Sequence, residues 1–172
     1  ITMAVEACTD FMGPAPRNTP AALVLASTSL PFTDRQNSVV VAEALNLDTA
    51  GLRTMDVSGS QRAGTSGLLA ALDTAAAGNG DAVLVASEHR RSLCASREEM
   101  VYGDGAAAVA VGTHDVLAEL VARHSDAVDF VDHYRSEGKF DYGWEERWVR
   151  DEGLMKLVPA ALVPDATGGP TG

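Results

Sequence analysis

The sequence has little basic charge and few aromatic side chains. Its 172 residues include 13 Lys and Arg against 24 Asp and Glu, which gives a formal net charge of −11, and aromatic residues make up 5%. A nucleic-acid partner requires a concentrated Lys/Arg surface, and no basic cluster of that kind is present, so the sequence excludes nucleic-acid binding as a general function. The shortage of aromatic residues favours closely packed helices and buried strands over an aromatic-lined groove.

Cysteines and long apolar runs are also scarce. Only Cys8 and Cys94 are present, far apart and without the spacing of metal ligands, so we expect no metal site. A reduced, cytoplasmic setting is the simpler interpretation, with a disulfide between the two as the alternative. No run approaches the roughly 20 apolar residues that span a bilayer. The start, ITMAVEACTDFM, lacks the order of a signal peptide and indicates a chain that begins inside a domain.

Strands alternate with helices over the first two thirds of the sequence. We expect helices over residues 2–11, 35–47 and 61–78, and strands over 21–30, 52–59, 81–88 and 103–112. The strands are near-continuous Val, Leu and Ala runs, which predicts an α/β fold with a parallel or mixed sheet covered on both faces. The first helix is expected to bury Met3, Ala7 and Phe11 and to end at Gly13-Pro14, and Asn37 or Ser38 is a plausible cap of the second.

The last third of the sequence has a different character. We expect one half-domain over residues 1–125, with a strand or helix at 115–124, then a charged, aromatic helical extension over 126–158 and a flexible Gly/Pro-rich tail over 159–172. Trp144, Trp148 and Val149 have the spacing of one helix face.

Three predicted strands end in polar residues. These are Ser27-Thr28-Ser29, Ser58-Gly59-Ser60-Gln61 and Ser87-Glu88-His89. Because α/β sheets place functional groups at the carboxyl ends of strands, we expect the site at this edge. The small-residue helix after Gln61 offers unpaired N–H groups to an anion, a carbonyl oxygen or a thioester. The alternative is that these small residues only allow close packing.

Nucleophilic catalysis by other residues is a weaker hypothesis. Ser58 or Ser60 needs a base, for which His89 and His133 are the candidates, but surface histidines are commoner. Cys94 lies among arginines, the surroundings of some reactive cysteines, although a loop cysteine without function is the better interpretation. The strand in YGDGAAAVAVG (102–112) has so little side-chain bulk that another sheet or subunit can pack closely against it.

Six stretches in a fixed order resemble a known family. They are VLASTSLPF, VVVAEALNL, MDVSGSQRAGTSGLLAAL, AVLVASEHRR, EEMVYGDGAAAVAVG and DFVDHYRSEGKFDY, and they cover most of residues 21–150. This order resembles the N-terminal half of a thiolase-superfamily condensing enzyme, above all 3-hydroxy-3-methylglutaryl-CoA (HMG-CoA) synthase and its bacterial and archaeal relatives. The resemblance implies half of a layered αβαβα fold, a homodimer and acyl-CoA thioesters as substrates, without a cofactor.

The resemblance also identifies where this sequence departs from the family. The family pattern A-C-K-A-G-T matches S-Q-R-A-G-T at residues 60–65, so Gln61 stands where the nucleophilic cysteine would be, beside the implied substrate-binding residues Ser60, Arg62, Gly64 and Thr65. Thr28, to within one residue, stands where the family has a glutamate acid/base. The family's histidine and asparagine belong to a C-terminal half, so we expect that half in the same or another chain.

Three functions are compatible with a glutamine at this position. The first is an HMG-CoA-synthase-like protein that forms or cleaves C–C bonds of acyl-CoA thioesters. The second is a malonyl-thioester decarboxylase, similar to loading ketosynthases with Gln for Cys, or an aldolase that works beside a zinc-ribbon/OB-fold subunit through an enolate in an oxyanion hole. The third is a non-catalytic dimerisation or scaffold subunit, in which the small-residue helix and strand 106–111 form an interface.

Overall fold

The computed structural model describes residues 1–13, 19–136 and 138–162. They divide into two compact units, one from within residues 1–90 and 100–117 and one from within residues 91–99 and 118–162. The elements are α1 (Thr2–Met12), β1 (Ala22–Ala26), α2 (Asn37–Ala44), β2 (Arg53–Val57), α3 (Ala63–Ala76), β3 (Ala82–Glu88), α4 (Arg97–Val101), β4 (Gly105–Val111), β5 (His133–Tyr134), β6 (Tyr142–Gly143), α5 (Glu146–Trp148), a π-helix (Val149–Leu154) and α6 (Leu157–Leu162).

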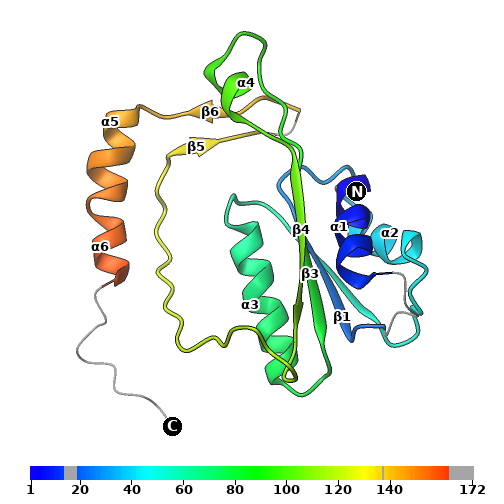
Figure 1. Cartoon of the computed structure of the whole chain (residues 1–172). Coiled ribbons are helices and arrows are strands. Elements are labelled where there is room, and N and C mark those ends of the chain that lie inside the picture. Colours follow the sequence, from blue (N-terminus) through cyan, green and yellow to red (C-terminus); the bar gives the residue numbers. More distant parts are fainter. Residues whose placement is uncertain (14–18, 137, 163–172) are drawn as a thin grey trace. The chain divides into compact units, whose positions relative to one another are not determined.

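The first unit is a mixed sheet between two helical layers. The strand order is β2-β1-β3-β4, with β1 parallel to both β2 and β3, and β4 antiparallel to β3. Helix α3 covers one face, and α1 and α2 cover the other (Figure 1). The central strand β1 reads ALVLA and is buried throughout, as expected for a strand covered on both sides. The predicted α/β class with a mixed sheet is confirmed.

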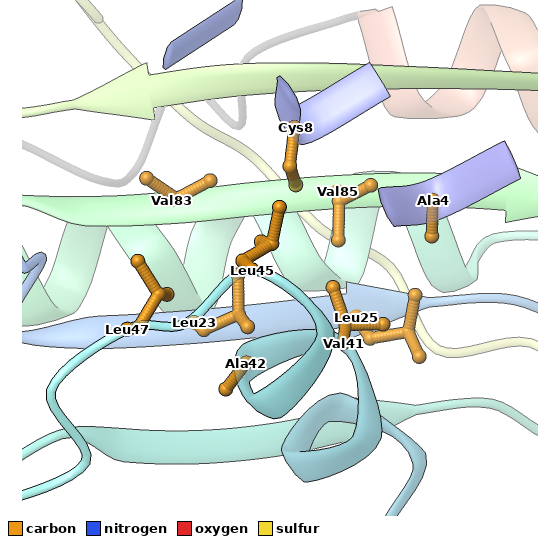
Figure 2. Packing of buried hydrophobic residues seen from close by; sticks show 10 residues of the cluster. All are labelled: Ala4, Cys8, Leu23, Leu25, Val41, Ala42, Leu45, Leu47, Val83 and Val85. Atoms are coloured by element: carbon orange, nitrogen blue, oxygen red, sulfur yellow. The ribbon is translucent and has the colours of Figure 1, made fainter. Parts of the chain in front are cut away.

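Alternate residues of each strand divide the core into two clusters. Leu23 and Leu25 of β1 and Val83 and Val85 of β3 face α1 and α2, as Figure 2 shows. Val24 of β1 faces α3 instead, together with Leu84 of β3. Full burial of a Leu or Val side chain stabilises a fold by about 1.5–3 kcal/mol, so the two clusters hold the helices against the sheet.

Helix α1 buries a different face from the one the sequence predicted. Ala4 and Cys8, one turn apart, are fully buried, whereas Phe11 is 46% exposed. The prediction grouped Met3, Ala7 and Phe11 by their spacing along one helix face. Small side chains face the sheet instead because α1 lies against β3 and β4 (Figure 2), where Ala108 contacts the same cluster. The low bulk of β4 therefore accommodates a helix of the same chain.

Gly67 allows α3 to pack closely against the other face of the sheet. A Cβ atom at Gly67 would lie 2.8 Å from Cδ1 of Leu84 and 3.3 Å from the Cβ of Ala26. At Gly64, one turn earlier, a Cβ would meet nothing within 4 Å. Close packing thus requires glycine at residue 67 but not at residue 64.

The second unit contains a small antiparallel pair of strands and three short helical segments. Tyr134 of β5 lies opposite Tyr142 of β6, with ring centroids 5.2 Å apart. The ring of Phe130 stacks on Trp148 at 6.1 Å. A Cβ at Gly153 would lie 2.7 Å from Phe130, so glycine is needed where the π-helix passes this ring.

Two predictions for this last third are wrong. Residues 115–124 form neither strand nor helix. Trp144 precedes α5, so it shares no helix face with Trp148 and Val149. Both predictions took the spacing of apolar residues as a sign of regular structure. In both stretches most of these residues are exposed, so no buried face supports the predicted regular structure there. Of the predicted tail, residues 163–172 lie outside the described part, as does Pro14 at the predicted end of the first helix.

Candidate functional site at the carboxyl edge of the sheet

Three polar segments meet at one edge of the sheet. In the parallel register, Ala26 of β1 lies opposite Val57 of β2 on one side and Ala86 of β3 on the other. Segments 27–29, 58–62 and 88–89, which follow these positions, therefore lie next to one another. The prediction that these three strand ends come together is confirmed.

The turn between β2 and α3 carries the predicted Gln61. Gly59 has a φ of 84°, a conformation that favours glycine, and it turns the chain sharply after β2. Ser60 then stabilises the turn, because its Oγ accepts a hydrogen bond from the Arg62 N–H at 3.2 Å and its carbonyl accepts one from the Ala63 N–H at 2.9 Å. Gln61 is exposed, one residue before the N-cap Arg62.

The start of α3 supplies backbone donors beside Gln61. The helix begins at Ala63 rather than at residue 61, so Gly64 and Thr65 lie in its first turn. The N–H groups of a first turn have no acceptor within the helix and favour negative charge. The predicted substrate-binding residues Ser60, Arg62, Gly64 and Thr65 are thus all in the turn or the first helical turn. Contact with a substrate remains a prediction.

Thr28 is joined to a carboxylate from the neighbouring strand. Its backbone N–H donates a 2.8 Å hydrogen bond to Oε2 of Glu88, the last residue of β3. The other oxygen of that carboxylate, Oε1, is enclosed and has no hydrogen-bond partner among the described residues. The sequence placed Glu88 in a polar strand end but gave it no role, because the contact depends on the pairing of β1 with β3.

Serine hydroxyls connect the same two strand ends. The Ser29 Oγ accepts a 2.9 Å hydrogen bond from the backbone N–H of His89, and the Ser27 Oγ accepts one from the Ser29 N–H at 3.0 Å. The first bond joins the segment after β1 to the segment after β3, and the second shapes the turn after β1. Together with the bond between Thr28 and Glu88, the first bond holds the two strand ends against each other.

His89 forms a surface pair instead of activating a serine. Its Nδ1 lies 2.8 Å from Oδ2 of Asp104, and the two side chains are 64% and 51% exposed. No hydrogen bond within the described residues joins His89 to Ser58 or Ser60. In the second unit, His133 Nδ1 lies 2.7 Å from Asp132. The arrangement that a serine nucleophile needs is thus not observed at Ser58 or Ser60.

Asp56 of β2 points to the opposite face, where it organises the start of α2. Its carboxylate accepts hydrogen bonds from the Asn37 N–H, the Asn37 side-chain amide and the Ser38 N–H, at 2.6, 2.9 and 2.8 Å. Burial raises the pKa of Asp56, but the hydrogen-bond donors of Ser38 and Asn37 outweigh burial and hold that pKa below its ordinary value. The N-cap residue is Gln36, so the predicted capping by Asn37 or Ser38 is wrong.

The remaining candidates contribute no further site. Cys8 is buried and Cys94 is exposed, and neither forms a disulfide, so the alternative of a disulfide between them is wrong. Within the described ranges, no group of three or more His, Cys, Asp or Glu side chains is placed to hold a metal ion. None of the helices in these ranges is long and apolar enough to cross a bilayer.

Comparisons with known proteins place this edge in a recognisable architecture. No family model and no curated protein matches the sequence. Among solved structures, MvaS in complex with 3-hydroxy-3-methylglutaryl coenzyme A is 24% identical, with a TM-score of 0.72 over 96% of this chain and 42% of that chain. PksG, an HMG-CoA synthase from Bacillus subtilis, is 21% identical, with a TM-score of 0.76 over 87% and 38%. An HMG-CoA synthase complexed with CoA is 15% identical, with a TM-score of 0.75 over 93% and 41%.

Proposed function

Because this chain has the thiolase-like fold of HMG-CoA synthases, we propose that it binds acyl-CoA thioesters and takes part in forming or cleaving a C–C bond. The observation that carries the proposal is the carboxyl edge of the sheet, where Thr28, Glu88 and the turn with Gln61 meet the first turn of α3. The chain spans about two fifths of the length of the structures it matches, so the complete activity is proposed for an assembly that includes further polypeptide.

Gln61 determines which chemistry the proposal includes. An uncharged amide forms no acyl-enzyme, so the proposed reaction does not pass through a covalent thioester at this position. The amide N–H₂ of glutamine donates hydrogen bonds, and with the first-turn N–H groups of α3 it suits the stabilisation of an enolate oxygen. Decarboxylation of a malonyl thioester or an aldol cleavage beside a zinc-ribbon/OB-fold partner both proceed through such an enolate and are the second candidate. Neither version uses a cofactor.

The setting of the protein forms part of the proposal. The absence of a disulfide at Cys8 and Cys94 supports a reducing, cytoplasmic compartment. Exposed apolar surface on β4, where Val109 is 48% exposed, supports further packing against a second copy or a C-terminal half-domain. The same surface is the argument for the third candidate, a scaffold without catalysis.

Substitution of Gln61 by cysteine tests the placement of the acyl site. The first turn of α3 favours a thiolate at this position, so Gln61→Cys incubated with acetyl-CoA is expected to gain one acetyl group, detected by mass spectrometry of the intact protein. The matched control is Gln36→Cys, which places an exposed thiol before the other helix, α2, on the opposite face of the sheet. Equal labelling of both variants, or none at residue 61, contradicts the proposed site.

Binding separates the scaffold from the other candidates. The purified protein is titrated with acetyl-CoA by calorimetry, alone and with any polypeptide that copurifies. Saturable binding that Arg62→Glu weakens is the expected result, because Arg62 is the N-cap residue of the helix proposed to receive the thioester. A complete absence of binding in both preparations favours the scaffold.

A further inference from the structure

The Glu88 carboxylate is held in a way that ordinary structural carboxylates are not. One oxygen, Oε2, accepts the Thr28 N–H at 2.8 Å, while Oε1 is enclosed and makes no hydrogen bond within the described residues. Enclosed polar atoms almost always have partners, and the exceptions call for a specific reason. Asp56 of β2 is different, because both of its carboxylate oxygens accept hydrogen bonds from α2.

The position of Glu88 in β3 places its side chain on the α3 side of the sheet. Residues Leu84 and Ala86, four and two positions earlier, belong to the cluster under α3, and strand side chains alternate between faces. Gln61 and the first turn of α3 lie on the same side and at the same edge. The Thr28 N–H is also at this edge, so its bond to Glu88 orients the carboxylate beside the proposed acyl site.

We propose that Glu88 is the acid/base group of this site, an inference that rests on the proposed function. In the step assigned to it, a carboxylate oxygen of Glu88 removes a proton from the carbon next to the thioester carbonyl. The C–H electron pair forms the enolate C=C bond while the carbonyl π pair moves onto oxygen, where Gln61 and the α3 N–H groups donate hydrogen bonds. Return of the proton from Glu88 to carbon reverses the step, so no further reactant is consumed.

Two other acidic or basic groups near this edge are poorer candidates. His89 follows Glu88, but its ring is 64% exposed and Nδ1 is paired with Asp104. Asp56 is on the far face and its carboxylate is fully used at α2. Among the described groups at the edge, Glu88 alone combines a fixed orientation with an oxygen that has no donor.

Exchange of the α-protons of acetyl-CoA in D₂O, followed by NMR, tests the assignment. The purified protein, together with any polypeptide that copurifies, is expected to exchange these protons. Glu88→Gln is expected to slow exchange by about a hundredfold or more, because an amide cannot accept the proton. Acetyl-CoA affinity and the unfolding temperature are expected to persist in this variant, because a glutamine oxygen still accepts the Thr28 N–H. The control is Glu43→Gln, which removes the same charge from an exposed position in α2.

Each outcome bears on the inference in a definite direction. Exchange in Glu88→Gln at the wild-type rate overturns the role of Glu88, as does a wild-type protein that binds acetyl-CoA without exchanging its protons. In both cases the proposed thioester binding stands. If the wild-type protein does not bind acetyl-CoA, the proposed function fails and the inference fails with it. Should Glu88→Gln not fold, Glu88→Asp is used, since it retains a carboxylate drawn back by one methylene, and unchanged exchange in that variant counts against the assignment.

Discussion

Asp56 joins the end of β2 to the first turn of α2 by three hydrogen bonds, and its stabilising effect depends on its charge. Because its pKa is lower in the folded chain than in the unfolded one, the interaction stabilises the fold above the unfolded pKa of about 3.9. That contribution is lost as the pH falls from there through the folded pKa.

The substitution Asp56→Asn is therefore expected to lower the free energy of unfolding by about 1 kcal/mol at neutral pH. The difference from wild type should shrink below about pH 4, where wild type itself loses the charge. Thermal unfolding at neutral and acidic pH measures both, with Asp10→Asn on the exposed side of α1 as the control. A difference that stays constant with pH would mean that geometry, and not charge, explains the effect.

The sequence predicts which residues lie at the candidate site better than it predicts the contacts that these residues make. The positions of Thr28 and Gln61 at strand ends follow from apolar runs and small-residue turns, which are local signals. The bond between Thr28 and Glu88 depends on a register between strands 60 residues apart in the chain, which no local pattern contains. The same limit applies to Asp56, whose partners in α2 are 18 and 19 residues away.

At the scale of elements, α3 is positioned by one glycine. Gly67→Val adds three methyl-sized groups where a Cβ alone already lies 2.8 Å from Leu84. We expect this substitution to lower the free energy of unfolding by about 1–3 kcal/mol or more through overpacking, as measured by urea denaturation. Gly64→Val makes the same change three residues earlier in open space, so it is expected to have little effect. Equal losses in the two variants would attribute the effect to valine in a helix and not to the sheet contact.

Elements were predictable where one signal dominates. Apolar runs predict the buried strands β1 and β3. Gly78, which has a φ of 71°, predicts the end of α3. The face of α1 was not predictable, because hydrophobicity favours Phe11 whereas the approach to β3 and β4 selects Ala4 and Cys8. The antiparallel direction of β4 is set by tertiary pairing and has no sequence signal of its own.

For the molecule as a whole, the open edge of the sheet bears on assembly. β4 pairs with β3 on one side only, contains no charged residue and exposes Val109. Unprotected apolar edges associate with other strands or chains. We therefore expect native mass spectrometry of the purified protein to detect either a homodimer or a complex with a polypeptide that supplies the other half-domain. A single unassociated chain at micromolar concentration would contradict this expectation.

The turn from Ser58 to Arg62 is exposed throughout. The strand β2 and the helix α3 that it connects are held by other side chains, which pack in the core cluster under α3. An exposed side chain such as that of Gln61 can be replaced at little cost in stability, unlike Gly59, whose φ of 84° favours glycine. Over evolutionary time, the residue at position 61 is thus free to change while the scaffold is retained. Substitutions at residue 61 can therefore accumulate by drift, because selection on folding does not oppose them.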